Sequence, residues 1–433
     1  MNELSFMEKL LDGVEVEWKA LGEVTQRTSN IKWRDATRSY QYIDLTSVSV
    51  ETKKIIETSE ITPNSAPSRA QKLVEKDDVI FATTRPTQMR YCLIDEEYDG
   101  EVASTGYCVL RAKKEDVLPK WILHLISSSE FKSYLEENQS GSAYPAISDA
   151  KVKKFRVPIP CPDNPKKSLA IQAEIVRILD AFTAMTAELT AELSLRKKQY
   201  NYYRDQLLSF EFPSSGGVPE GRGGREVEWK TLGDVTKKWY SGGTPTAGNP
   251  EYYDGGNIPW LRTQEVKFSD IESTEVKVTQ AALDNSSAKW IPANCVIIAI
   301  SGATAGRSAI NKIPLTTNQH CGCLEIDSSK ALYRYVFHWV SYNYENIKAL
   351  GQGARGDLNS SIIKNFKFPI PFADDPEKSL AEQARIVAIL DKFDGLTNSI
   401  TEGLPREIEL RQKQYEYYRD LLLSFPKQEE VAA

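Results

Sequence analysis

The chain contains a long internal repeat. Residues 15–25, EVEWKALGEVT, return at 226–236 as EVEWKTLGDVT, with nine of eleven positions identical at an offset of 211. Residues 155–182 return at the same offset with 18 of 28 identical, and residues 195–210 return at 410–425 with 13 of 16 identical at an offset of 215. This period is far longer than the roughly 20 to 50 residues of stacked repeats, so the chain is a duplicated domain unit and not a solenoid.

The segments between the repeated blocks differ from each other. Residues 28–150 and 239–361 are equally long, yet they share almost no sequence. One repeated scaffold therefore carries two unlike inserts, and 433 residues are long for a single core. A glycine- and proline-rich stretch between the halves is typical of a linker. We divide the chain into a first insert-bearing domain (1–154), a central repeated region (155–211), a linker (212–224), a second insert-bearing domain (225–365), a distal repeated region (366–425) and a tail (426–433).

Both repeated regions carry the pattern of a long amphipathic helix. From Ser168 onward, apolar residues alternate in steps of four and three, at Ile171, Ile175, Ile178, Phe182, Met185 and Leu189. The second copy has Ile386, Ile389, Phe393, Leu396 and Ile400. Such a heptad seam must be buried against another helix, and each copy is the obvious partner of the other. We expect a helix-pair interface that includes Ile175, Ile178, Phe182, Leu189, Ile386, Ile389, Phe393 and Ile400.

The two helices are expected to differ in one place. In the first, the seam shifts phase at TAELTAEL (186–193) before it resumes at Tyr200. A four-residue insertion keeps a helix continuous while it changes the local winding, and each further unit would add about 6 Å of helix. In the second, GLPR (403–406) replaces this segment. Pro405 predicts a kink or a restart because proline cannot donate a hydrogen bond within a helix.

Two interpretations of the paired seam stay open. The seam alone favours a coiled coil for oligomerisation. The unlike inserts favour instead a stiff helical bar that holds two different globular modules, as a protein needs if it must touch two places on one rigid ligand.

Both inserts have the pattern of mixed α/β domains. Short apolar strands are predicted at 78–84, 104–110 and 295–301, and a helix follows in each insert, near 118–138 and 329–347. The polar loops between them carry side chains that suit DNA, because arginine pairs with guanine and glutamine with adenine. The candidate DNA-contacting residues are Thr84, Arg85, Gln88, Arg90, Tyr144, Lys151, Lys154, Thr244, Arg262, Gln264, Thr304, Arg307, Asn318 and Arg355.

These candidates also have a simpler interpretation. An exposed loop arginine is commonly a solvated charge or the partner of a carboxylate. Lys151, Lys153, Lys154 and Arg156 could hold phosphates, or they could form a solvated edge. A net charge of −6 argues against nucleic-acid binding, unless the basic groups lie on one face or a partner protein supplies contacts to the phosphates.

Sequence patterns for catalysis are weak or missing. The glycine-rich cofactor loop and the NPP[YF]-like or DPP[YF]-like motif of a DNA amine methyltransferase do not occur. GATAGRS (302–308) lacks the lysine of a phosphate-binding loop. Asp270, Glu275 and Lys277 resemble a metal-dependent nuclease pattern, but such triplets are common in a chain with 60 acidic residues. The sequence favours a binding protein over an enzyme.

Patterns for metals and membranes are equally weak. His320, Cys321 and Cys323 lack the paired C-x2-C spacing of a zinc site, and we expect no metal there. The six cysteines are scattered, which indicates reduced thiols. No stretch is apolar for the roughly 18 to 20 residues that cross a bilayer, so we expect no membrane association and a cytoplasmic location.

Nearly the full length resembles the DNA specificity subunits of type I restriction-modification systems. The resemblance is carried by VEWKALGE and VEWKTLGD, by FRVPIP with Gln172 and FKFPIP with Gln383, and by both QY-x-YYRD endings. The TAEL units are similar to those of the type IC subfamily. In the second insert the resemblance extends to SGGTPTAGNPEYYDGGNIPW, GATAGR and TTNQHCG, whereas the first insert matches more loosely.

The resemblance implies a fold and a function. The fold has two α/β (α+β) target recognition domains per chain, separated by an antiparallel pair of long coiled-coil helices and related by pseudo-twofold symmetry. Each domain reads one half of a bipartite site in double-stranded DNA, and the helix pair sets the spacer. The chain is non-catalytic and carries no cofactor. Two methyltransferase subunits with S-adenosylmethionine dock on the repeated regions, and restriction subunits with ATP and Mg²⁺ add cleavage. The alternative is a non-catalytic coiled-coil adaptor that binds proteins.

Overall fold

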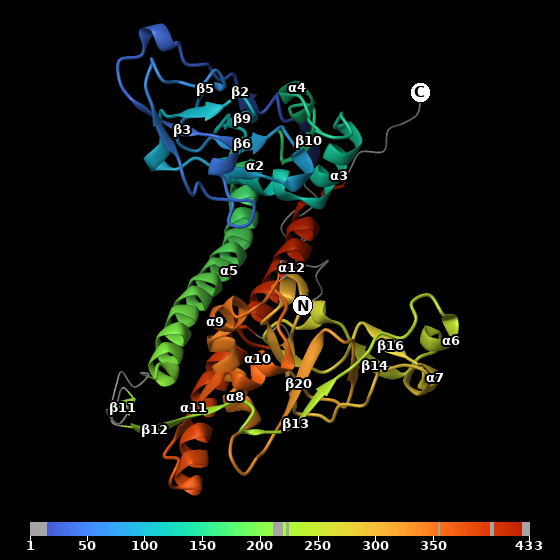
Figure 1. The fold of residues 1–433 in the computed structure, drawn as a ribbon. Coiled ribbons are helices and arrows are strands. Elements are labelled where there is room, and N and C mark those ends of the chain that lie inside the picture. Colours follow the sequence, from blue (N-terminus) through green and yellow to red (C-terminus); the bar gives the residue numbers. More distant parts are fainter. Residues whose placement is uncertain (1–14, 211–219, 222–224, 354–355, 399–401, 427–433) are drawn as a thin grey trace. The chain divides into compact units, whose positions relative to one another are not determined.

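The computed structural model describes residues 15–210, 220–221, 225–353, 356–398 and 402–426. The chain forms two compact units (Figure 1): unit 1 is residues 1–190 with 407–433, and unit 2 is residues 191–406. Each unit therefore combines one insert-bearing domain with helical segments from both copies of the repeat. Most of the predicted linker, and the predicted tail after Pro426, lie outside the described residues.

The α/β domain of unit 1 is built on small sheets. The repeated segment VEWKA forms β1 (Val16–Ala20), which pairs antiparallel with β10 (Arg156–Pro160). One four-stranded sheet has the order β2 (Thr25–Gln26), β9 (Tyr107–Ala112), β6 (Val79–Ala82) and β7 (Tyr91–Leu93). The other has the order β4 (Ser59–Ile61), β3 (Tyr40–Ile43), β8 (Val102–Ser104) and β5 (Ala70–Leu73). The first two predicted strands are confirmed, and all four residues of β6 are buried.

The helix predicted near 118–138 is divided in two. α2 (Pro119–Ser127) and α3 (Ser129–Asn138) meet at Ser128, whose extended backbone ends the first helix and whose side chain accepts a hydrogen bond from the Phe131 amide of the second. Serine favours this capping role because its hydroxyl satisfies an amide that has no helical partner. α2 buries Trp121 in the core that also holds β6 and β9. The short helix α4 (Asp149–Val152) then leads into β10.

Unit 2 repeats this plan with different sequence. β12 (Arg225–Thr231) pairs with β21 (Lys367–Pro371) and with the short β11 (Glu220–Gly221). A five-stranded sheet has the order β13 (Thr236–Ser241), β20 (Cys321–Ile326), β17 (Val296–Ala299), β18 (Ser308–Asn311) and β15 (Asp270–Ile271). A three-stranded sheet has the order β16 (Val276–Val278), β14 (Ile258–Leu261) and β19 (Thr316–Thr317). The helices are α6 (Pro250–Tyr253), α7 (Gln280–Asp284), α8 (Tyr333–Tyr342), α9 (Tyr344–Ala349) and α10 (Ser360–Asn365).

The two inserts share a strand topology that their sequences hide. The hairpin β6–β7 lies on β9 in unit 1, and the hairpin β17–β18 lies on β20 in unit 2. In the second sheet, β3 runs parallel to β8, and β14 runs parallel to β19. The first strand of each hairpin, β6 or β17, is buried at all four positions, which requires apolar residues without fixing which ones. The fold therefore persists although the residues do not.

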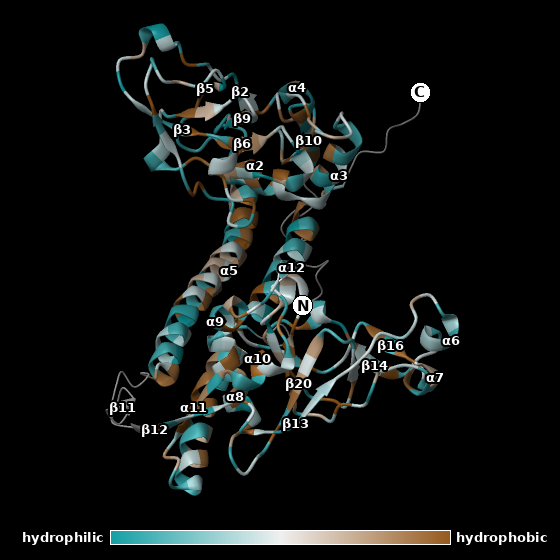
Figure 2. Ribbon diagram, in the orientation of Figure 1, coloured by the Kyte–Doolittle hydropathy of each residue, from teal (hydrophilic) through white to brown (hydrophobic). Residues whose placement is uncertain are grey.

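The repeated regions form long helices, as predicted. α5 (Pro165–Leu208) is one helix of 44 residues that passes through the TAEL segment without a break. In the second copy, α11 (Pro376–Thr397) ends and α12 (Gly403–Leu423) begins before Pro405, so the predicted restart is confirmed. Figure 2 shows apolar and polar residues mixed along α5, as expected of an amphipathic helix. None of the described helices is long and apolar enough to cross a membrane.

The helices of the two copies pair with each other, as predicted, and they run antiparallel. In unit 1, Phe182 of α5 stacks on Tyr418 of α12, with ring centroids 5.4 Å apart. In unit 2, Phe393 of α11 stacks on Tyr203 of α5 at 5.5 Å. Each seam thus contacts the tyrosine-rich end of the other copy, because antiparallel helices place the start of one beside the end of the other.

Burial along the seams is uneven. Ile175 and Ile386 are fully buried in the cores of their units, whereas Ile178, Phe182, Leu189, Ile389 and Phe393 are partly buried. Met185 and Leu396 are 43% and 37% exposed, so the expectation that the whole seam is buried is wrong at this pair of equivalent positions. Ile400 lies outside the described residues.

Candidate nucleic-acid interface

The polar loops of unit 1 meet at the end of strand β6. The loop that joins β6 to β7 is tied through its backbone to the loop before α4. Thr84 forms an isolated β-bridge with Ala146, and the Arg85 amide donates a hydrogen bond to the Pro145 carbonyl at 2.7 Å. Two loops that are distant in the sequence therefore form one surface.

Arg85, Gln88 and Tyr144 are exposed on this surface. The Arg85 guanidinium lies 5.8 Å from the centroid of the Tyr144 ring, within the range of a cation–π contact. Arg85 and Met89 have φ angles of 50° and 53°, on either side of the 3-10 turn at Pro86–Gln88. Non-glycine residues in this left-handed region indicate a turn whose shape is imposed by its surroundings. The turn holds Arg85 and Gln88 toward solvent.

Arg90 lies within the loop cluster and is partly buried. Its guanidinium donates a hydrogen bond to the carbonyl of Val48. Beside it, the Lys53 ammonium donates to the Met89 carbonyl at 2.5 Å and lies 4.6 Å from the centroid of the Tyr91 ring. Burial, and secondly the charge of Arg90, lower the pKa of Lys53 to about 8. Arg90 stabilises this loop, and its contact with DNA stays a prediction.

The predicted phosphate-binding lysines lie at the end of α4. The Lys151 ammonium donates to the Asn138 carbonyl at 2.8 Å, although the residue remains exposed. Lys154 is exposed, and Arg156 donates to the Trp18 carbonyl at 2.9 Å. Lys154 is therefore the member of this group whose ammonium is best placed to meet a phosphate.

Loops also meet in unit 2, at the carboxyl ends of β13, β14, β17 and β19. The Thr244 hydroxyl donates to the side-chain oxygen of Gln319 at 2.6 Å, and Ser301 Oγ lies 2.7 Å from His320 Nδ1. The Asn318 amide donates to the last carbonyl of β14 at 3.1 Å. The turn between β19 and β20 thus connects the other three loops, and Gln319 and His320 are exposed on it.

Arg262 is neutralised by acidic neighbours. Its guanidinium forms a hydrogen-bonded ion pair with Glu275 and lies 3.6 Å from a carboxylate oxygen of Glu265. The Gln264 amide, oriented with its oxygen toward Arg262, accepts hydrogen bonds from both terminal guanidinium nitrogens at 3.2 Å. Arg262 therefore has no free charge to offer to a phosphate. It instead orients the side chain of Gln264, which is exposed.

The remaining candidates of the second insert lie around the same loops. Thr304 and Arg307 are half-buried on the β17–β18 hairpin, where the Arg307 amide donates to the Thr304 carbonyl at 3.0 Å. Asn318 is 8% exposed, and its side-chain oxygen accepts from the His320 amide at 3.1 Å, so it shapes the turn. Arg355 lies outside the described residues. Gln319 was not a candidate from the sequence, and His320 was considered only as a metal ligand, although both lie in the segment TTNQHCG (316–322).

The possible metal and nuclease residues serve the fold. Cys321 and Cys323 are buried in β20, and burial raises the pKa of Cys321 to about 12. His320 is bonded to the loop instead, and Asp270 pairs with Arg334 at 3.0 Å. Among the residues that the structure describes, no three His, Cys, Asp or Glu side chains gather as a metal site.

A buried glutamine joins each domain to its helix in the same way. Gln172 of α5 accepts a hydrogen bond at 3.0 Å from a backbone amide, and donates at 3.0 Å to a backbone carbonyl, in the segment that enters α2. Gln383 of α11 makes the same two bonds, at 2.9 and 3.3 Å, with the segment that enters α8. Both glutamines are fully buried. Because an unpaired buried amide is costly, these bonds fix the position of each domain on its helix.

A buried histidine makes a second equivalent contact in each unit, about two turns further along the long helix. His124 of α2 lies 3.1 Å from the Asp180 carboxylate of α5, and His338 of α8 lies 2.6 Å from the Asp391 carboxylate of α11. Although burial raises the pKa of Asp180, hydrogen bonds, that of His124 first, lower it below its usual value. The scaffold therefore holds the two unlike domains by equivalent contacts.

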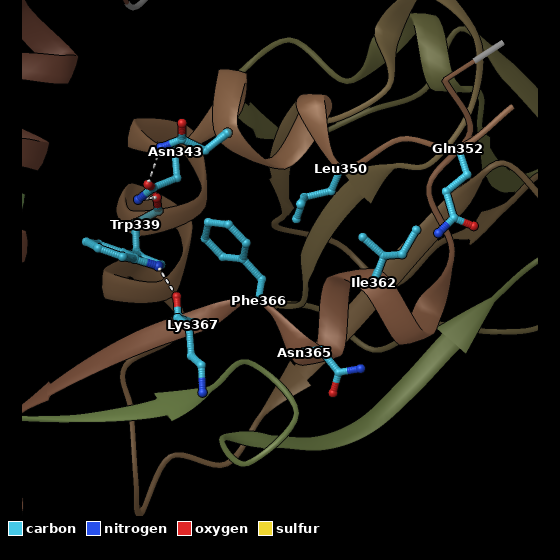
Figure 3. A pocket seen from close by; sticks show the side chains of 9 residues that line it. Trp339, Asn343, Leu350, Gln352, Ile362, Asn365, Phe366 and Lys367 are labelled. Carbon is cyan, nitrogen blue, oxygen red and sulfur yellow. Dashed lines mark hydrogen bonds between the residues drawn. The ribbon is translucent and has the colours of Figure 1, made fainter. Parts of the chain in front are cut away.

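Unit 2 has a cavity among α8, α9 and α10. It measures about 530 Å³ and is lined by Trp339, Asn343, Asn346, Leu350, Gln352, Ile362, Asn365, Phe366 and Lys367. Figure 3 shows the Trp339 indole donating to the Lys367 carbonyl at one wall, a bond of 2.8 Å. In unit 1, the ring of Phe155, which is the twin of Phe366, lies 5.3 Å from that of Tyr134 and is buried.

Comparisons with known proteins agree on one family. The family model described as type I restriction modification DNA specificity domain matches the chain twice, at residues 14–196 and 225–410. The chain is 42% identical to the type I restriction enzyme EcoR124I/EcoR124II specificity subunit of Escherichia coli, over all of both chains. It is 31% identical to the EcoprrI specificity subunit of Escherichia coli, over 93% of each chain.

Solved structures share the fold. A chain from a structure of the type I R-M system, described in terms of complex assembly and conformational transition, has a TM-score of 0.59 and 22% identity over 94% of this chain and 97% of that one. The type I restriction-modification S subunit from M. genitalium has a TM-score of 0.57 and 14% identity over 96% and 98%. The arrangement of two α/β domains with long helices is therefore found in other proteins.

Proposed function

The chain belongs to the type I restriction-modification DNA specificity family, and we propose that each of its two loop clusters reads one half of a bipartite site in double-stranded DNA. The observation that carries this proposal is the pair of loop clusters. Two inserts without sequence similarity place polar loops at corresponding strand ends, on scaffolds that hold them by the same contacts. This is the arrangement expected of one reading device with two different sequences to read.

The test of this proposal is the methylation pattern of DNA. The chain is produced with its cognate methyltransferase subunit, and methylated adenines are mapped by sequencing. We expect one bipartite motif with two unlike half-sites and an unread spacer of fixed length. A random pattern, or a single continuous motif, would contradict the proposal.

The proposal assigns the chemistry to partner subunits. The chain supplies no catalytic residue and no cofactor, while methyltransferase subunits bring S-adenosylmethionine and restriction subunits bring ATP and Mg²⁺. Its place of action is the cytoplasm, where the DNA is. The purified chain alone should then leave DNA unmethylated and uncut, and methylation should appear on addition of the methyltransferase subunit. Either activity from the pure chain would contradict this assignment.

Twin exposed patches on the helices support the docking of two methyltransferase subunits. Leu195 and Tyr202 are 60% and 59% exposed on α5, seven residues apart and so on one face. Their twins Leu410 and Tyr417 are 43% and 54% exposed on α12. Two equivalent patches suit two copies of one partner. Lysine at both Leu195 and Leu410 should abolish assembly, and lysine at one of them should leave a complex with a single methyltransferase subunit, as measured by the mass of the complex.

We further propose that the length of α5 sets the spacer. The helix is continuous across the TAEL units, so four more residues lengthen it by about 6 Å, or roughly two base-pair steps. One more TAEL unit inserted after Leu193 should lengthen the methylated motif only in its spacer. Altered half-sites would contradict this role.

The alternative function is a coiled-coil adaptor whose two modules bind proteins. It shares the scaffold, but it predicts no affinity for duplex DNA that falls with salt. DNA binding by the assembled complex, measured at several salt concentrations, separates the two functions because phosphate contacts release counterions.

A further inference from the structure

In each insert a strand is followed directly by a 3-10 turn, and we call this strand end and turn a corner. The corner of the first insert has the same structure as the corner of the second insert, which contains Arg262. Strand β3, which runs parallel to β8, is followed by a 3-10 turn at Leu45–Ser47. Strand β14, which runs parallel to β19, is followed by a 3-10 turn at Thr263–Glu265. The residue before each turn donates its amide to the side chain three positions on, Asp44 to Ser47 and Arg262 to Glu265, both at 3.0 Å. Thr46 in the first corner is therefore the counterpart of Gln264 in the second.

Both corners belong to the loop cluster of their own unit. In unit 1, the Tyr107 hydroxyl donates to the Asp44 carbonyl at 3.0 Å, and Arg90 of the β6–β7 loop donates to the Val48 carbonyl. In unit 2, the last carbonyl of β14 accepts from the Asn318 amide. The corner of the first insert is thus attached to the loop that exposes Arg85 and Gln88, although no residue of this corner was a candidate from the sequence.

The middle residue of each turn points to solvent while its neighbours hold the turn in place. Thr46 and Gln264 are exposed, whereas Ser47 and Val48 in the first corner and Val266 in the second are buried. The hydrogen bonds from Arg262 hold the Gln264 oxygen and leave both amide protons free to donate. A glutamine amide held in this way offers two donors, which match the N7 and O6 acceptors of guanine in the major groove, and a threonine offers a hydroxyl to a base edge and a methyl to thymine.

We propose that Thr46 is a specificity-determining residue for the first half-site, in the position that Gln264 occupies for a guanine of the second. The proposal rests on the function proposed above and deepens it, because it assigns one base of each half-site to one side chain of equivalent location. Arg262 is a positioning residue that orients the Gln264 amide.

The experiment compares methylation motifs of variants in the complex with the methyltransferase subunit. A plasmid library randomises each position of both half-sites, and methylated members are counted by sequencing. Thr46→Val removes the hydroxyl and should relax or change one position of the first half-site by about tenfold or more, with the second half-site unchanged. Thr46→Ser keeps the hydroxyl and should retain the preference for any base that is read through it. Gln264→Leu should relax one guanine position of the second half-site alone.

Controls separate this inference from the proposed function. The unchanged chain must first give a bipartite methylation motif. If it does not, the proposed function is wrong, and the assignment of Thr46 is not what has failed. Thr190→Val makes the same substitution on the exposed surface of α5 and should leave both half-sites unchanged. If Thr46→Val methylates the original first half-site with undiminished preference, or changes the second half-site, the assignment is wrong. If Thr46→Val and Thr46→Ser both fail to assemble, crosslinking of Thr46→Cys to DNA that carries a thiol-reactive base in the first half-site decides, and an absent crosslink overturns the proposal.

Discussion

The first and second units hold their domains in the same way and expose different side chains. Gln172 and Gln383 make the same two backbone hydrogen bonds. The equivalent strands β10 and β21 pair with VEWKA and with VEWKT, respectively. At the loops the likeness ends, because the β6–β7 loop exposes Arg85 beside Tyr144, whereas Thr304 and Arg307 on the equivalent β17–β18 hairpin are half-buried. The duplication therefore separates two tasks, with fixed residues for holding and variable residues for contact.

The units also differ in whether a loop arginine is paired with a carboxylate. In unit 2 the Arg262 guanidinium is shared between two carboxylates and the Gln264 amide. In unit 1 Arg85 has a ring contact but no carboxylate within the ion pairs of the described residues. At these two positions the half-sites are thus expected to be read with different chemistry, by a free guanidinium at Arg85 and by an oriented amide at Gln264.

The largest effect is expected from the loop arginines. Arg85→Ala should relax one position of the first half-site, and Arg307→Ala one position of the second, each by about tenfold to a hundredfold because a bidentate pair with guanine is lost. Methylation of a library with randomised half-sites measures both. Arg177→Ala, on the exposed face of α5, is the matched control. A variant that alters both half-sites would contradict the claim that each unit reads its own half-site independently.

A smaller effect is expected from the twin glutamines. Gln172→Leu and Gln383→Leu should each lower the free energy of unfolding by about 1–3 kcal/mol, since each leaves a buried backbone amide and a buried backbone carbonyl without a hydrogen-bond partner. Chemical denaturation followed by fluorescence measures this, with the exposed Gln280→Leu as control. Similar losses in the two variants support equivalent scaffolds, and a loss in only one of them would show that the units are held differently.

The smallest effect is expected from Glu275→Gln. The substitution removes one of the two carboxylates beside Arg262, and an exposed pair of this kind is worth only about 0–1 kcal/mol. The freed guanidinium should raise the affinity of the complex for DNA up to about fivefold and steepen its salt dependence. Glu272→Gln, on the same connection between strands, should do less. Equal changes in the two variants would mean that general charge, and not Arg262, is responsible.

The sequence predicted the scaffold well because its signals are local. The TAEL stutter and Pro405 act on the helix that contains them, and both expectations are confirmed. The strands in VIFA and VIIA followed from apolar runs, which burial on both faces requires. The seam alone does not give the direction in which the helices pair, and the antiparallel pair was expected from the family resemblance. The individual contacts of Phe182 with Tyr418 and of Phe393 with Tyr203 were not predicted.

The site was harder to predict because it depends on contacts between distant loops. Nothing in the sequence around Arg262 indicates that Glu275 neutralises it, since the pair forms only when β16 folds beside β14. The corner at Thr46 carries no arginine or glutamine, and its importance emerges only from its equivalence with the corner at Gln264. Which of the candidate residues contact DNA stays a prediction.

The most direct test of two independent reading domains on one twin scaffold is a chain with the same insert twice. Because residues 28–150 and 239–361 are equally long and stand at equivalent positions, the first can replace the second without a change of length. In complex with the methyltransferase subunit, this chain should methylate a site made of two copies of the first half-site in inverted orientation, with the spacer unchanged. A motif that keeps the original second half-site would contradict the account.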